Sequence, residues 1–151
     1  MIWKLRKATE ADFDRINELF IEMLQTIYNT EDVKGYSNGD LDRFFENREE
    51  WICVAIDEEE NIIAFLSIEV HHEDKGFVYL DDLSVTNQYR NKGIGTELIK
   101  NAEAYAKDIK IHSIRFHVEK SNVKAFRLYE RLGYKIFEDQ GNRYLMEKLE
   151  V

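Results

Sequence analysis

The feature that most constrains the fold is a change of pattern at Gly93, where a run of strands gives way to a helix. Three apolar stretches precede this point, at residues 51–56, 62–71 and 77–85. An acidic turn at 57–61 and a turn at 74–76 separate them, which predicts an antiparallel meander of three strands. After Gly93, apolar residues from Ile94 to Ala106 recur at helical spacing. The chain therefore combines a meander with a helix that starts at a glycine-containing loop.

The rest of the chain continues this mixed pattern. Thr9 and Asp12 have the spacing of a capping box, and a helix is expected over 10–28. The other predicted elements are a strand at 2–7, a short helix at 41–49, a strand at 112–118, a helix at 122–132 and strands at 134–138 and 143–149. The helix between residues 85 and 112 makes its flanking strands candidates for a parallel pair. The order predicts an α+β fold, and the length of 151 residues suits a single domain over 1–151.

Composition excludes several classes of protein. No apolar run approaches the roughly 20 residues that span a membrane, and residues 1–6 do not begin a signal peptide, so a cytoplasmic location is the default expectation. Cys53 is the only cysteine, which rules out an intrachain disulfide, and it lies in a strand-like apolar run. It is therefore interpreted as a small core residue.

Charge is distributed unevenly along the chain. The net charge of −9 argues against general binding to nucleic acid. Residues 1–89 contain 8 Lys and Arg against 21 Asp and Glu, whereas residues 90–151 contain 13 against 9. Two interpretations stay open: two ligands of opposite charge, or solvated helix faces.

The loop from Arg90 to Thr96 has the composition of an anion site. Gly93 and Gly95 allow close backbone approach, and a helix that starts here points unpaired N–H groups and a partial positive charge outward. The Walker A pattern is absent, and Leu98 stands where a dinucleotide fingerprint requires a third glycine. The loop alone therefore indicates an anion without identifying it.

A second motif lies about thirty residues downstream: Asn122-x-x-Ala125-x-x-Leu128-Tyr129-x-x-Leu132-Gly133-Tyr134. Together with Arg90-x-x-Gly93-x-Gly95, it closely resembles the GCN5-related N-acetyltransferase (GNAT) superfamily. The resemblance covers most of the chain. It implies a mixed, mostly antiparallel sheet of about seven strands flanked by about four helices, with a splayed strand pair at 76–85 and 112–118.

The resemblance also implies an acetyl-CoA site. The pantetheine arm would run along Leu83, Ser84 and Val85, and Asn122 would contact the cofactor. The pyrophosphate would be held by the backbone amides of Arg90, Asn91, Lys92, Gly93, Ile94, Gly95 and Thr96. Tyr129 would lie near the thioester sulfur and donate to the leaving thiolate, although an aromatic residue of an amphipathic helix is more often core. Two residues depart from the family pattern: Asn87 replaces a frequent Pro and Asn91 a frequent Gly.

The sequence identifies the general base less clearly than it identifies the acetyl-CoA site. Asp81 and Asp82 are the best candidates for a general base, because paired carboxylates can raise one pKa to a useful value. Strand alternation predicts that they point to opposite faces. They could equally anchor a cationic substrate or form a solvated pair. Glu69 and His117 are secondary candidates.

The expected reaction transfers an acetyl group to a primary amine of a small, cationic molecule or a peptide, by direct attack in a ternary complex. Side chains flanking the polar segment at 29–40 either line the acceptor site or pack the N-terminal helices, namely Tyr28, Tyr36, Phe44 and Phe45. His71 and His72 are adjacent strand residues and do not predict a metal site, so no metal is expected. The rival hypotheses are a CoA-binding sensor without turnover, and an acyltransferase for longer acyl chains or alcohols. No nucleic-acid or membrane partner is expected, and a homodimer through the C-terminal strands is suggested by the family resemblance alone.

Overall fold

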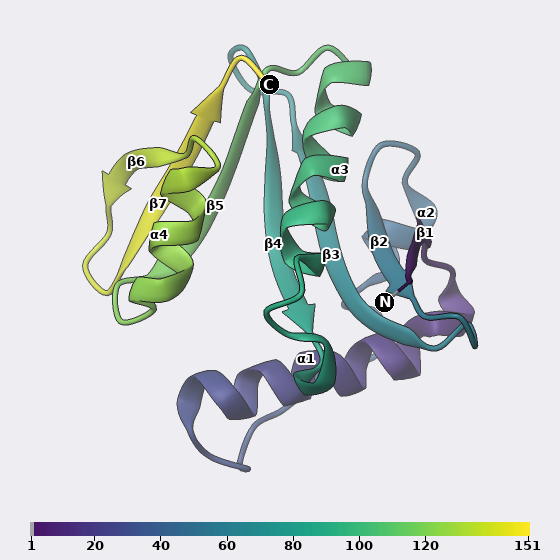
Figure 1. The fold of residues 1–151 in the computed structure, drawn as a ribbon. Helices are drawn as coiled ribbons and strands as arrows, with labels where there is room; N and C mark the ends of the chain where they lie inside the picture. Colours follow the sequence, from purple (N-terminus) through teal and green to yellow (C-terminus); the bar gives the residue numbers. More distant parts are fainter. Residues whose placement is uncertain (1) are drawn as a thin grey trace.

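The structure, a computed structural model, describes residues 2–151 as one seven-stranded sheet flanked by helices (Figure 1). The strands are β1 (Lys4–Lys7), β2 (Trp51–Ile56), β3 (Ile62–His71), β4 (Phe77–Val85), β5 (Ser113–Glu119), β6 (Lys135–Asp139) and β7 (Arg143–Leu149). The helices are η1 (Glu10–Asp12), α1 (Phe13–Tyr28), α2 (Asp42–Glu46), η2 (Asn87–Tyr89), α3 (Ile94–Asp108) and α4 (Val123–Arg131), where η marks a 3-10 turn. The strands of the predicted meander have the predicted bounds, and other elements differ at their ends by a few residues. No helix within the described residues is both long and apolar enough to cross a membrane.

The strand order is β1-β2-β3-β4-β5-β7-β6. Neighbouring strands are antiparallel except β4 and β5, which are parallel. This confirms the mixed, mostly antiparallel sheet and the parallel pair across α3. The long connection through a helix is what allows two parallel strands to become neighbours.

β4 and β5 separate soon after they pair. Their register consists of Val78 opposite Ile114 and Tyr79 opposite Arg115. Beyond these pairs the strands diverge, and the sheet opens between them (Figure 1). Along residues 80–85, β4 therefore presents backbone N–H and C=O groups to the opening. The predicted splayed strand pair is confirmed.

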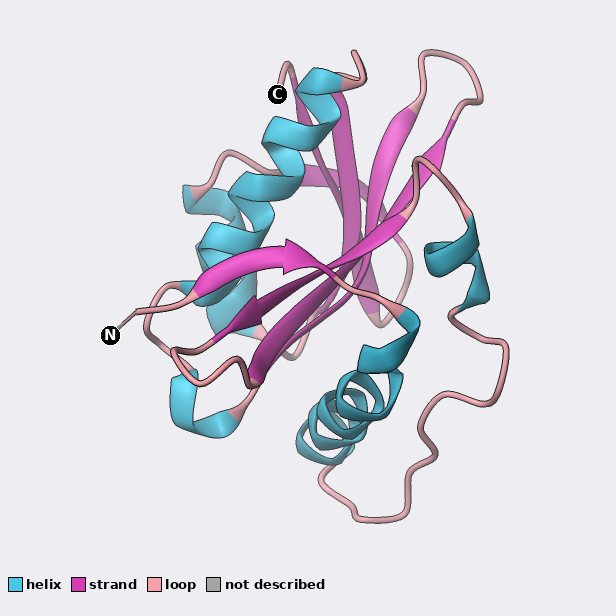
Figure 2. Cartoon of the chain, turned by 90° about the vertical axis from the view of Figure 1, so that its right-hand side faces the viewer, coloured by secondary structure: helices cyan, strands magenta, loops and turns pink. Residues whose placement is uncertain are grey.

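Helices cover both faces of the sheet. α3 and α4 lie on one face, and α1 and α2 lie on the other (Figure 2). Leu66 of β3 belongs to the core under α3, whereas its neighbour Phe65 belongs to the core under α1. Alternation along β3 thus supplies side chains to both cores, which explains why this strand is almost continuously apolar.

A bulge in β4 corrects one prediction from the sequence. Leu80 pairs with Ile68, and Leu83 pairs with the β3 residue two positions earlier, so Asp81 and Asp82 together oppose a single residue. The prediction that the two carboxylates point to opposite faces is wrong, because an extra residue shifts the side-chain alternation. Both carboxylates instead have their polar neighbours on the α1 side of the sheet.

Candidate functional site

The loop between β4 and α3 is held in shape by its own arginine. Arg90 Nε donates to the carbonyl oxygen of Val85 at 2.9 Å, and Arg90 Nη2 lies 3.8 Å from a Glu22 carboxylate oxygen. Asn91 adopts left-handed backbone at φ 62°. Asparagine visits this region more readily than most residues, so Asn91 suits the turn.

The two glycines leave the start of α3 open. Gly93 has φ 90°, and a Cβ added to it would meet no atom within 4 Å. A Cβ on Gly95 would meet only Leu83, at 3.8 Å. The first N–H groups of α3 have no acceptors within the helix, and the helix dipole adds partial positive charge there. An anion with several oxygens can therefore approach these amides directly.

A cavity of about 730 Å³, which we call the loop cleft, lies between this loop, the open edge of β4 and α4. Except for the exposed Lys92, every residue of the predicted cofactor set lines it: Leu83, Ser84, Val85, Arg90, Asn91, Gly93, Ile94, Gly95, Thr96, Asn122 and Tyr129. Two cations that the sequence analysis did not single out, Lys124 and Arg131, join Arg90 in the lining. Of the residues that the structure describes, no Asp or Glu lines the loop cleft, so its charge is positive.

Several side chains around the loop cleft are already engaged in hydrogen bonds within the protein. The Ser84 hydroxyl is buried and donates to the Leu19 carbonyl at 3.0 Å, which leaves only the Ser84 backbone for a ligand. The Asn122 side-chain oxygen accepts from the Ala125 N–H at 3.2 Å and caps α4. Lys124 Nζ donates to the Asn91 side chain at 3.2 Å, and this bond ties α4 to the loop across the opening.

Tyr129 lies where two cavities meet. It lines both the loop cleft and a second cavity, and its ring packs edge-on against Phe116 with 4.5 Å between centroids. Within residues 2–151 its hydroxyl has no hydrogen-bond partner, and burial raises the pKa of this phenol. The ring is therefore packed like a core residue, while the hydroxyl stays protonated and available to a ligand.

The second cavity, of about 270 Å³, lies in the opening between β4 and β5, and we call it the carboxylate cavity. Asp81, Asp82 and Glu119 line it together with one cation, Arg143. It shares part of its wall with the loop cleft, namely Met23, Ile27, Leu83, Asn122 and Tyr129. The two cavities are therefore adjacent, with these side chains at their boundary.

The two adjacent carboxylates differ in their surroundings. The Tyr36 hydroxyl donates to Asp82 at 2.5 Å, and the Tyr36 ring stacks on Phe20 at 3.9 Å. Burial raises the pKa of Asp82, but the bond from Tyr36 opposes that rise. Burial, followed by the charges of Asp82 and Glu69, raises the pKa of Asp81 to about 7, although Asp81 still touches solvent. Asp81 therefore exchanges its proton near neutral pH.

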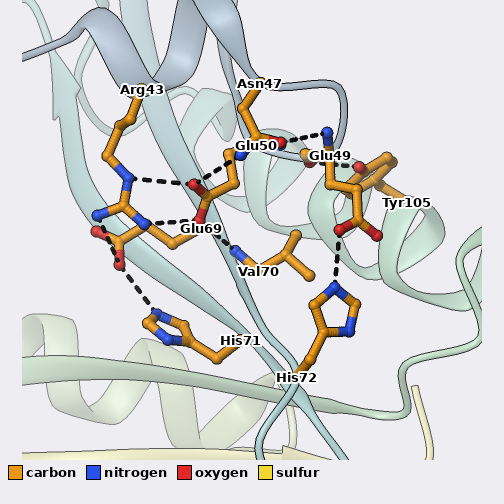
Figure 3. A network of polar contacts seen from close by, with 9 residues as sticks. All are labelled: Arg43, Asn47, Glu49, Glu50, Glu69, Val70, His71, His72 and Tyr105. Atoms are coloured by element: carbon orange, nitrogen blue, oxygen red, sulfur yellow. Dashed lines mark hydrogen bonds and ion pairs between the residues drawn. The ribbon is translucent and has the colours of Figure 1, made fainter.

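A network behind the cavity fixes Glu69 and α2 (Figure 3). Arg43 of α2 holds the buried Glu50 through two bonds, at 3.2 and 2.7 Å, and lies 3.7 Å from Glu69. Glu50 also accepts from the Val70 N–H at 2.9 Å. Because a buried carboxylate is costly unless it is fully bonded, these contacts anchor α2 to the sheet and fix the Glu69 charge near Asp81.

Tyr79 and His117 form a hydrogen-bonded chain in the carboxylate cavity. Gln140 donates to Glu138 at 2.9 Å, so its carbonyl oxygen faces the His117 Nε2–H at 2.8 Å. His117 Nδ1 is then the acceptor for the Tyr79 hydroxyl, at 2.5 Å. Burial lowers the pKa of His117 and raises that of Tyr79 to about 12. A neutral imidazole thus accepts a hydrogen bond from the phenol of Tyr79, and both residues line the cavity.

Of the aromatic residues and histidines considered from the sequence, only some lie near the cavities. Tyr28 lines the carboxylate cavity, whereas Phe44 and Phe45 pack in the core under α1. His71 bonds to Glu69 at 3.0 Å and His72 to Glu49 at 2.7 Å. Among the described residues no group of three or more His, Cys, Asp and Glu side chains could hold a metal ion.

Cys53 lies in the core, 1% exposed, and burial raises the pKa of its thiol to about 12. A thiol in this state is protonated at neutral pH and reacts poorly as a nucleophile. Its interpretation as a small core residue fits this environment.

Comparison with known proteins places this geometry among acetyltransferases. A sequence model described as the Acetyltransferase (GNAT) family matches residues 16–134. Streptothricin acetyltransferase A of Bacillus subtilis is 26% identical over 145 residues, which cover 87% of this chain and 83% of that protein. The uncharacterized N-acetyltransferase YhfO of the same organism is 30% identical over 140 residues, which cover 91% of each.

Solved structures share the fold over the full length. The PaiA N-acetyltransferase from Thermoplasma acidophilum, in complex with coenzyme A, matches with a TM-score of 0.81 at 22% identity over 99% of both chains. An acetyltransferase of the GNAT family from Staphylococcus aureus matches with a TM-score of 0.83 at 13% identity, over 99% of this chain and 100% of that one.

Proposed function

Because the chain belongs to the GNAT family and is an N-acetyltransferase that uses acetyl-CoA, we propose that its acceptor is a primary amine of a small cationic molecule or a peptide. The contrast in charge between the two cavities carries this proposal. The loop cleft is lined by three cations, as an anionic donor requires, and the carboxylate cavity is lined by three acids and one arginine. An ammonium group is attracted to such acids.

The shape and charge of the loop cleft suggest an orientation for the donor. The pyrophosphate of acetyl-CoA lies against the amides of residues 90–96, where the glycines leave room and the helix start supplies positive charge. The pantetheine arm runs along the open edge of β4, pairing with the backbone of Leu83, Ser84 and Val85. This orientation brings the thioester to Tyr129, at the boundary shared with the carboxylate cavity.

Three groups supply the chemistry. Asp81 accepts a proton from the acceptor's ammonium, because its pKa of about 7 suits proton exchange at neutral pH. The free amine forms the new C–N bond, and the backbone N–H near Leu83 or Ser84 stabilises the oxyanion of the tetrahedral state. The C–S bond then breaks, and the Tyr129 hydroxyl donates a hydrogen bond to the leaving thiolate. The thiolate takes up the second proton of the attacking nitrogen, so that CoA leaves as a thiol and the product is a neutral amide. The Tyr79–His117 pair is the alternative proton acceptor.

An amine-panel assay tests this function. Pure protein is incubated with acetyl-CoA and polyamines, aminoglycosides, basic amino acids or short peptides, and release of CoA is followed with a thiol reagent. Turnover is expected with at least one cationic amine. Thermal stabilisation by CoA without turnover on any amine would favour a sensor. Faster release of CoA from a longer acyl-CoA than from acetyl-CoA would show that the donor is a longer acyl-CoA. Transfer of the acetyl group to an alcohol would show that the acceptor is not an amine.

A further inference from the structure

One cation lies among the acids of the carboxylate cavity. Of the residues that the structure describes, Arg143, the first residue of β7, is the only Lys or Arg that lines it. Its guanidinium forms no hydrogen bond or ion pair with any residue from 2 to 151, whereas Arg43 and Arg115 each bind a carboxylate. Glu119 is directly opposite in the β5–β7 register, yet no ion pair joins the two. Arg143 therefore offers unpaired N–H donors at the wall of the carboxylate cavity.

The position of Arg143 is fixed by the sheet. Arg143 is close enough to Tyr79 and His117 for its charge to lower the pKa of both. It belongs to β7, which is two strands away from β4 and its carboxylates, Asp81 and Asp82. Two strand spacings amount to about 10 Å, and the separation is larger here because β4 and β5 have diverged. The cation and the carboxylates therefore face each other across the cavity.

The chemistry of this cation indicates what it binds. A guanidinium presents several N–H donors in a planar fork that matches the two oxygens of a carboxylate. A ligand that places its ammonium at Asp81 and Asp82 has its far end within reach of Arg143. An amine and a carboxylate on the same carbon are too close together to span the two walls. A carboxylate several bonds from the reacting amine spans them.

We propose that Arg143 binds a carboxylate of the acceptor, and that the acceptor is a molecule with a primary amine and a carboxylate separated by a chain of several carbons. The side-chain amine of a basic amino acid is of this class, and so is a linear amino acid with its amine at the end of the chain. This inference rests on the proposed function, since it assumes that the amine reacts at the junction of the two cavities.

Matched acceptors test the inference. Lysine and cadaverine differ only by the carboxylate, and hexylamine carries a methyl group in place of the carboxylate of 6-aminohexanoate. In each pair the wild-type protein is expected to have the higher kcat/KM for the member with the carboxylate. Arg143→Gln is expected to lower kcat/KM for the member with the carboxylate about tenfold or more, mainly by raising KM. Arg143→Lys is expected to have a kcat/KM between those of the wild type and Arg143→Gln. Arg127→Gln, an exposed arginine of α4 that lines neither cavity, serves as the control.

Three results separate the possible failures. If cadaverine and hexylamine are acetylated as well as their partners by the wild type, the inference is wrong and the proposed function stands. If Arg143→Gln lowers turnover of both members equally, Arg143 acts on the Tyr79–His117 pair and the inference is again wrong. If no amine of any kind is acetylated, the proposed function fails and this inference fails with it.

Discussion

The loop cleft and the carboxylate cavity share a wall but are built differently. The loop cleft depends on backbone: a helix start, two glycines and the open edge of a strand. The carboxylate cavity depends on side chains from β4, β5, β7 and α1, which meet only because the sheet opens. A backbone site suits a donor that stays the same, whereas side chains can change and so define the acceptor. The variants below test this division of roles.

The largest effect is expected on the acceptor side. Asp81→Asn removes the proposed proton acceptor and should lower kcat/KM about a thousandfold. Binding of CoA, measured by calorimetry, should stay within about twofold, because Asp81 does not line the loop cleft. Asp108→Asn, at the exposed end of α3, is the control. If activity falls only a few fold, the proton passes to another group, and His117→Gln would then show whether the Tyr79–His117 pair is that group.

The second largest effect is expected on CoA binding in the loop cleft. Gly93→Val places a side chain where the pyrophosphate would lie and should weaken CoA binding about a hundredfold, since several charge-assisted hydrogen bonds are blocked together. Gly141→Val is a matched control: Gly141 has φ 87°, close to the 90° of Gly93, and its added Cβ also meets nothing within 4 Å. Equal CoA affinity in the two variants would show that the loop does not hold the pyrophosphate.

Tyr129 tests the boundary between the two cavities. Tyr129→Phe keeps the packing on Phe116 and removes only the hydroxyl, so kcat should fall about tenfold while CoA affinity is kept. Stopped-flow measurement of acetyl transfer, with Tyr144→Phe on β7 as control, separates this loss from a change in product release. An unchanged kcat would leave Tyr129 as a packing residue.

The smallest effect is a shift in pH dependence. The charge of Asp82 is one cause of the raised pKa of Asp81, so Asp82→Asn should let Asp81 lose its proton at lower pH. The acid-side fall of kcat/KM should then move down by about one pH unit. The amide oxygen of Asn still accepts from Tyr36, which preserves the local structure. A profile that does not move would mean that Asp81 is not the titrating base.

Some of the site could be read from residue spacing. Arg90, Gly93 and Gly95 lie close together in the sequence, and the helix that follows them is periodic, so more than half of the residues that line the loop cleft were singled out from the sequence. Its missed cations, Lys124 and Arg131, lie on α4, and only the packing of α4 beside the opening brings them to the loop. A signal existed in the basic second half of the chain, but it did not single out these two.

The carboxylate cavity was harder to predict for a physical reason. Tyr79, His117 and Arg143 are far apart in sequence and share a wall because β4, β5 and β7 are successive in the sheet. The faces of Asp81 and Asp82 were mispredicted because a one-residue bulge leaves no mark in a hydrophobic pattern.

The sequence by itself determined the strands, the helices, the glycine loop and the lone buried cysteine, because these follow from local periodicity and backbone freedom. The tertiary structure decided that burial and neighbouring charges raise the pKa of Asp81 to about 7, that Tyr129 lies at the boundary of the two cavities and that Arg143 lines the carboxylate cavity. Those properties depend on burial and on neighbours from other strands and helices, and only the folded sheet brings them together.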